Sequence, residues 1–115
     1  MPLLAACVSL FFGGSVLAMS HPKLTGTTGP AFKITLKNSK GKLVKTLKAG
    51  TYTFVIHDKS NIHSFDLDGP HKFAKDFTKI PFVGTKTVTL TLKKGSYKYY
   101  CGNHESTMFG HFTVN

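Results

Sequence analysis

Short segments of alternating apolar and polar residues recur along most of the chain. The clearest are 51–57, where every second residue is Tyr, Phe or Ile, and 87–92, where Val and Leu alternate with threonine. Such alternation is typical of a strand with one face in the core and the other in solvent. We predict further strands at 31–36, 43–47, 62–67, 96–101 and 109–114. In the first of these, Phe32 is expected to share the inward face with Ile34 and Leu36.

Turn-forming residues separate these segments at intervals of 8 to 12 residues. Examples are Asn38-Ser39-Lys40-Gly41 and Asp68-Gly69-Pro70, which combine Asn, Asp, Gly and Pro in the positions that turns favour. Apart from one short helical turn considered at 73–77, no segment beyond the N-terminal region has helical periodicity. The pattern predicts an all-β protein, a Greek-key β-sandwich or barrel of about seven to eight strands.

The chain of 115 residues is long enough for one domain. Residues 3–19 are apolar or small and uncharged, so we interpret 1–20 as a signal peptide that is cleaved near its end. An uncleaved membrane anchor is the alternative, although the run is short for a membrane span. Residues 21–30, rich in Thr, Gly and Pro, are expected to form a flexible lead-in to a domain at 31–115. The protein is then exported to a periplasmic or extracellular location.

The chain is strongly basic, with 15 lysines, no arginine and a formal net charge of +10. This excess suggests an acidic partner, an anionic surface or a role in solubility. Nucleic acid is disfavoured, because bidentate recognition of bases and phosphates favours arginine and because the lysines are dispersed. We expect a monomer with no stable membrane span once the signal is removed.

The candidate chemistry lies in the last quarter of the chain. Cys101 ends an aromatic strand, and His104 and Met108 follow it in a short loop before the final strand. Cys7 falls in the predicted signal, so Cys101 would be the lone thiol of an exported protein. Thiolate, imidazole and thioether are ligands that copper prefers, and His63 could supply the second imidazole of a trigonal site. We therefore predict one copper ion per chain.

Taken singly, these residues have simpler explanations. Cys101 could be a buried thiol and Met108 core filler, and it is their combination with His104 and His63 that favours a metal. The other histidines fall outside the predicted site. His57 and His111 are expected on outer strand faces and His71 in a turn, and His21 could chelate copper only as a new N-terminus.

The segment 99–110, Tyr-Tyr-Cys-Gly-Asn-His-Glu-Ser-Thr-Met-Phe-Gly, resembles the C-terminal copper loop of small blue-copper proteins, the cupredoxins, such as plastocyanin and azurin. The segment 61–65 resembles the stretch that carries that family's first histidine. The resemblance spans roughly 29–114. It implies that the metal ligands are His63, Cys101, His104 and Met108.

Three departures from that family are visible. Only three residues separate His104 from Met108, where plastocyanin loops commonly have four, and Asn103 stands where many relatives have Pro. Ser64 stands where many relatives have an Asn whose side chain tethers the two ligand loops. Gly110, by contrast, matches the family's Met-x-Gly ending.

The resemblance implies a type 1 copper protein that carries single electrons between redox partners, which could be acidic. The ring edge of His104 would be the electron port, with Phe109 in an apolar docking patch. A copper carrier or storage protein with the same ligands is the alternative, and a metal-free structural or adhesion domain is a third. We do not expect an enzyme, because paired carboxylates, a Ser-His-Asp triad and phosphate-loop or dinucleotide motifs are missing from the sequence.

Overall fold

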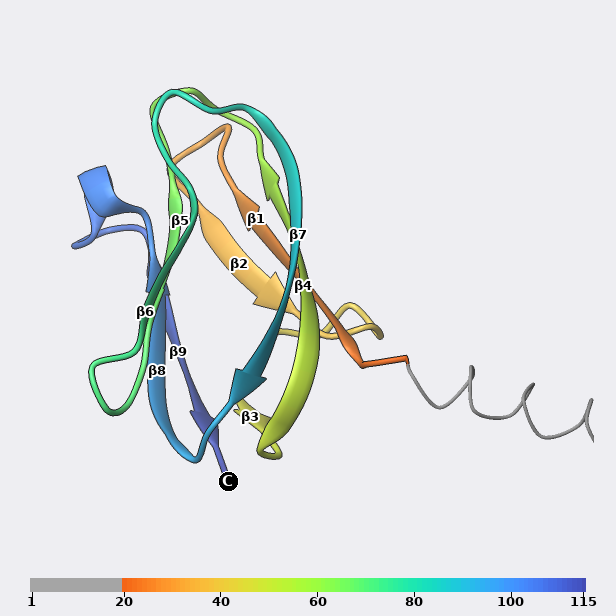
Figure 1. Cartoon of the computed structure of the whole chain (residues 1–115). Coiled ribbons are helices and arrows are strands. Elements are labelled where there is room, and N and C mark those ends of the chain that lie inside the picture. The colour runs from red at the N-terminus through yellow and green to blue at the C-terminus, as the bar shows by residue number, and fades with distance from the viewer. Residues whose placement is uncertain (1–19) are drawn as a thin grey trace, which may run out of the picture.

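The computed structural model describes residues 20–115 (Figure 1). The predicted signal peptide therefore lies outside the described residues, except for Ser20. The described chain forms nine strands and one short 3-10 helix. They are β1 (Lys23–Thr28), β2 (Ile34–Lys37), β3 (Thr46–Leu47), β4 (Gly50–Asp58), β5 (Phe65–Asp68), β6 (Ala74–Thr78), β7 (Gly84–Leu92), β8 (Gly95–Tyr100), η1 (Gly102–His104) and β9 (Phe109–Val114).

The strands form two sheets that face each other (Figure 1). One sheet has the order β2-β1-β4-β7 and the other the order β3-β9-β8-β5-β6. The pairs β1–β4 and β3–β9 are parallel, and the remaining pairs are antiparallel. The structure confirms the predicted all-β sandwich. It contains no helix that could cross a membrane within residues 20–115.

Aromatic side chains from both sheets fill the space between them. Phe54 of β4 packs against Phe77 of β6, with ring centroids 5.2 Å apart. Phe65 stacks on Tyr99 at 5.7 Å, so β5 and β8 are joined by side chains as well as by their ladder. Alternate residues of β4 are buried, as the sequence predicts for Tyr52, Phe54 and Ile56. Aromatic pairs of this kind add roughly 0.5–1.5 kcal/mol each beyond the burial of their surface.

The segment 21–30 is not a flexible lead-in, and that prediction is wrong. Residues 23–28 form β1, which lies between β2 and β4 inside the first sheet. Its inward positions are Leu24, Gly26 and Thr28, and a Cβ on Gly26 would lie 2.6 Å from the Ile56 side chain. The strand thus needs a glycine for close packing. Because Gly26 and Thr28 occupy inward positions where apolar residues are expected, the sequence lacks the alternation that would have predicted this strand.

Two smaller predictions also fail. The helical turn considered at 73–77 is replaced by β6, an edge strand paired with β5. Phe32 does not point inward, because β2 begins only at Ile34 and Phe32 lies in the preceding loop with 61% of its surface exposed. The edge strand has weak periodicity, whereas Phe32 continues the alternation of Ile34 and Leu36 although the strand has not yet begun, so the local pattern could not settle either.

The strand directions define two ends of the sandwich. Four connecting segments (29–33, 59–64, 79–83 and 101–108) lie at the end toward which β8 runs, and we call this the site end. The turns 38–45, 48–49, 69–73 and 93–94 lie at the other end, together with the start of β1 and the end of β9. In Figure 1 the site end is uppermost and the C-terminus is at the bottom.

Candidate metal centre

Two neighbouring strands bring the candidate ligands together at the site end. β5 and β8 are antiparallel, with Asp66 opposite Tyr100. Continuing that register by two positions places Ser64 opposite Gly102, so His63 and Cys101 lie at the same end of one ladder. His104 is the last residue of η1, which begins immediately after Cys101. One sheet therefore supplies all three.

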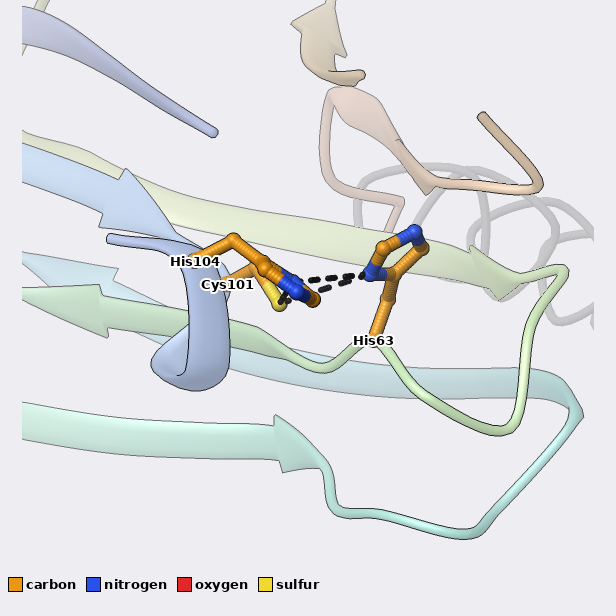
Figure 2. Close-up of side chains that lie close together, drawn as sticks. All are labelled: His63, Cys101 and His104. Carbon is orange, nitrogen blue, oxygen red and sulfur yellow. Dashed lines mark hydrogen bonds between the residues drawn. The ribbon is translucent and has the colours of Figure 1, made fainter. Parts of the chain in front are cut away.

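Figure 2 shows these three side chains converging. The Nδ1 atoms of His63 and His104 are 3.2 Å apart. The Cys101 sulfur lies 3.8 Å from Nδ1 of His63 and 3.5 Å from Nδ1 of His104. Ligand atoms at roughly 2.0–2.3 Å from a metal in a trigonal plane would be about 3.5–3.8 Å apart. The triangle agrees with that size to within a few tenths of an ångström.

Burial makes this cluster more than a chance grouping of polar side chains. Cys101 and His63 are fully buried, whereas His104 is partly exposed. Nε2 of His63 is buried without a hydrogen-bond partner, while its Nδ1 faces the other two ligand atoms. Nδ1 is therefore the nitrogen of His63 that is placed to bind a metal together with His104 and Cys101. A metal ion at the centre of the triangle would satisfy both Nδ1 atoms and the sulfur, so the donor set fits copper.

Main-chain hydrogen bonds hold the loop that carries Cys101 and His104. Cys101 donates its N–H to the carbonyl of Met108 at 3.1 Å, which closes the loop where β8 ends and β9 begins. The carbonyl of His104 accepts from the N–H of Met108 at 2.8 Å and from that of Thr107 at 3.0 Å. The short loop is therefore a compact turn that fixes the position of His104 relative to the sulfur.

Met108 is buried with 1% of its surface exposed. Its carbonyl accepts a hydrogen bond from the N–H of Cys101. The three ligand atoms that converge belong to His63, Cys101 and His104. Its thioether therefore stays a prediction as a fourth ligand. The remaining histidines lie elsewhere, with His57 bonded to Thr85 at 3.0 Å and His111 opposite Lys98 in the β8–β9 ladder.

Ser64 tethers the two ligand segments. Gly102 donates its N–H to the Ser64 hydroxyl oxygen at 2.8 Å, and the hydroxyl donates to Asp66 at 3.2 Å. The main-chain N–H of Ser64 donates to the Cys101 sulfur at 3.4 Å. In the sequence, Ser64 is notable only because it stands where the cupredoxin pattern commonly has Asn. In the structure, its hydroxyl links the two ligand segments, as the sequence pattern leads one to expect of that Asn.

Asp66 is a functional candidate that the sequence reasoning missed. It is buried, with 8% of its surface exposed, and lies opposite Asp76 of β6 in the ladder. Burial, followed by repulsion from the Asp76 carboxylate, raises the pKa of Asp66 from 3.8 to about 7. This carboxyl group is therefore partly protonated near neutral pH, two hydrogen bonds away from Gly102. A lone Asp in a strand gives no signal of this kind.

Phe32 was also missed as part of the site. Its ring lies edge-on to both imidazoles, with centroids 5.1 Å from His63 and 4.7 Å from His104. Gly29 allows this loop to lie close, because a Cβ there would be 2.9 Å from the His63 ring. Phe32 thus contacts both imidazoles from the solvent side.

Comparison with known proteins identifies the fold of the described chain. The sequence matches no family model and no curated protein. Among solved structures, it is similar to a copper protein, rusticyanin, with a TM-score of 0.58, 21% identity and coverage of 81% of this chain and 76% of that one. A structure of reduced rusticyanin has a TM-score of 0.57 and 21% identity, with coverage of 81% of this chain and 78% of that one.

A third similar structure, a His-to-Met variant of rusticyanin, gives a TM-score of 0.53 and 22% identity over the same 81% of this chain. The chain therefore has the cupredoxin fold, as the sequence resemblance implies. The arrangement of His63, Cys101 and His104 fits a blue copper site within that fold.

Proposed function

We propose that the protein is a type 1 copper protein that carries single electrons between redox partners. The observation that carries the proposal is the convergence of two Nδ1 atoms and one sulfur into a triangle of metal-binding size. Copper in such a site accepts and releases one electron. The protein's part is to hold ligands that suit both oxidation states in a rigid, largely dry setting.

We assign four ligands, His63, Cys101, His104 and, as a weak axial donor, Met108. Burial of Met108 beside the loop and its link to Cys101 support the fourth assignment. The tether through Ser64 opposes movement of one ligand segment relative to the other. Rigidity of this kind limits rearrangement when the charge of the metal changes, and that favours repeated electron transfer over release of the ion.

The surface around His104 supports docking of a partner protein. His104 is the ligand of the triangle that reaches the surface. Exposed apolar side chains lie in the connections of the site end or next to them: Phe32, Ile62, Ile80, Val83 and Phe109. Clusters of this kind mark sites of protein association. We propose that redox partners approach this end and that electrons pass through the ring of His104.

A titration with Cu(II), followed by visible spectroscopy, tests the copper site. We expect an intense thiolate-to-copper band at one copper per chain, lost in Cys101→Ser and kept in His111→Gln, which alters an exposed histidine of β9. Absence of the band in a folded protein would contradict the proposal. Repeated reduction and reoxidation then separates the two roles, because an electron carrier keeps its copper and a copper-delivery protein loses it to a Cu(I) chelator.

Export of the protein through residues 1–20 is part of the same proposal. It rests on the uncharged apolar segment 3–19. Expression of the whole chain in a bacterial host, followed by mass determination of the periplasmic product, checks it. A mature protein that begins close to residues 19–21 is expected, and an uncut chain held in the membrane would contradict a cleaved signal.

A further inference from the structure

The end of the sandwich opposite the candidate metal centre concentrates positive charge. Nine of the 15 lysines lie in its turns or at the strand ends beside them, and all nine are exposed. They are Lys23, Lys37, Lys40, Lys42, Lys45, Lys48, Lys72, Lys93 and Lys94. We call this set the lysine end. Lysines that look dispersed in the sequence are thus gathered by the fold.

One acidic side chain lies beside these nine lysines. Asp68 is exposed at the end of β5, next to the turn 69–73, and accepts a hydrogen bond from the Tyr100 hydroxyl. Asp58 and Glu105 lie at the site end, and Asp66 and Asp76 lie within the strands β5 and β6. Within residues 20–115, the one ion pair joins Lys98 to Glu105, and neither belongs to the lysine end. Apart from Asp68 and the carboxylate of Asn115, the charged groups at this end are all lysines, so the charge there is strongly positive. Such a surface attracts an extended anionic partner.

An exposed leucine stands among these lysines. Leu43 follows Lys42 and has 49% of its surface exposed, while the next residue, Val44, is buried in the core. The side chain of Asn38 accepts hydrogen bonds from the main-chain N–H groups of Lys40 and Lys42, at 2.9 and 3.1 Å. The turn is therefore held in shape, and it carries an exposed apolar side chain next to exposed lysines.

We propose that the lysine end docks on a membrane surface that contains anionic phospholipids. Lysines from several turns at one end of the molecule match a broad, laterally mobile layer of headgroups. An arginine fork would be expected for bidentate recognition of a fixed partner group, and the chain has no arginine. Each lysine near an anionic membrane contributes about 1 kcal/mol, and Leu43 adds an apolar contact at the interface.

This orientation has a direct consequence for the other end. The lysine end and the site end are at opposite poles of the sandwich (Figure 1). A protein docked by its lysines would therefore present His104 and the apolar side chains around it away from the lipid. Membrane docking depends on the charge and topology of the lysine end alone, so it can be tested whether or not the protein binds copper.

Co-sedimentation with lipid vesicles tests the docking surface. The hydrophobic core of residues 20–115 runs from Leu24 to Val114, so a protein beginning at Ser20 keeps these core contacts and lacks the apolar segment 3–19. We expect it to bind vesicles that contain about 30% phosphatidylglycerol in phosphatidylcholine and not to bind phosphatidylcholine alone. Binding should weaken as salt rises from about 0.05 M to about 0.5 M.

Two variants of equal net charge show whether the location of the lysines matters. Lys40→Gln, Lys42→Gln and Lys94→Gln together remove three charges from the lysine end. Lys33→Gln, Lys59→Gln and Lys79→Gln remove three exposed charges from the site end. We expect at least a tenfold loss of vesicle partitioning for the first and less than a twofold loss for the second. Equal losses would overturn the proposal, since net charge alone would then explain binding.

A tryptophan reporter tests contact at Leu43, because the chain contains no tryptophan. Leu43→Trp and Val83→Trp place a single indole at exposed positions of the two ends, where the native side chains are 49% and 56% exposed. A blue shift of emission on anionic vesicles is expected for the first and not for the second. Binding to soluble polyaspartate without binding to vesicles would instead indicate an acidic macromolecule and overturn the membrane proposal.

Discussion

Ser64 donates its main-chain N–H to the sulfur of Cys101 across 3.4 Å. The two residues are 37 positions apart in the chain, and the β5–β8 ladder brings them together. A hydrogen bond from a fixed main-chain donor stabilises negative charge on the sulfur, and contacts of this kind tune the affinity and electronic properties of a metal site. The side chain of the same residue holds Gly102, so Ser64 controls both the position and the surroundings of the sulfur.

Replacing Ser64 with Ala is expected to lower the free energy of unfolding by about 1–3 kcal/mol. The change leaves the N–H of Gly102 without its acceptor in a partly buried place and removes the donor to Asp66. Urea denaturation of the metal-free protein measures the loss. Ser96→Ala, at an exposed position of β8, is the control and should change stability by less than about 0.5 kcal/mol. A Ser64→Ala midpoint equal to that of the control would contradict the tether.

Asp66 should make stability depend on pH in an unusual direction. The pKa of Asp66 is 3.8 in the unfolded reference and about 7 in the fold. Between these values the folded state binds more protons than the unfolded state, so stability falls as pH rises from about 4 to about 7. At roughly 1.4 kcal/mol per pKa unit, the fall amounts to a few kcal/mol.

Thermal unfolding of the metal-free protein at several pH values checks this. Asp66→Asn should flatten the pH dependence in that window and be more stable than the native chain above pH 7. Asp76→Asn should shift the fall toward lower pH, because it removes the carboxylate opposite Asp66 that helps to raise its pKa. The same slope in all three proteins would rule out Asp66 as the cause.

Removal of the Phe32 ring should speed the loss of copper. The ring lies edge-on to both imidazoles, so Phe32→Ala would open the solvent side of the site. We expect extraction of Cu(I) by a chelator to become at least severalfold faster, with stability changed by less than about 1 kcal/mol because the side chain is already largely exposed. Leu43→Ala, an exposed side chain at the other end, should leave the extraction rate unchanged. Equal rates in both variants would show that Phe32 does not protect the site.

Tyr97 should stabilise the β7–β8 turn through its hydroxyl. The oxygen accepts the N–H of Lys93 at 3.0 Å, and the hydroxyl donates to the carbonyl of the same residue at 2.8 Å. Tyr97→Phe removes both bonds and keeps the ring stacked on Phe112, so a loss of about 1–2 kcal/mol is expected in urea denaturation. Tyr100→Phe, whose hydroxyl makes one exposed bond to Asp68, should cost less. An equal cost for the two variants would contradict the role of the turn.

The sequence was most informative where one face of a strand is buried and where ligands are close along the chain. Alternation predicted β4 and β9, and the spacing of Cys101 and His104 predicted their part in the cluster. His63 could be chosen because its segment resembled a known pattern. Both kinds of information are local, or are carried by a short motif.

The features that were missed depend on neighbours from distant parts of the chain. Gly26 is inward because Ile56 and Phe65 leave no room for a side chain, and that cannot be read from the segment itself. Asp66 becomes unusual only when β6 places Asp76 opposite it. Phe32 looks like a strand residue until the loop after β1 turns it toward the two imidazoles.

The origin of all three ligands in one sheet also couples metal capture to folding. His63 is 38 residues from Cys101, and the β5–β8 ladder sets their separation, whereas Cys101 and His104 are only three residues apart in any conformation. An unfolded chain can therefore offer a metal ion just the nearby pair, and the complete triangle exists only after the ladder has formed. The ion would then bind the folded protein more tightly than the unfolded chain, and a bound ion would raise the free energy of unfolding with the logarithm of the ratio of the two affinities.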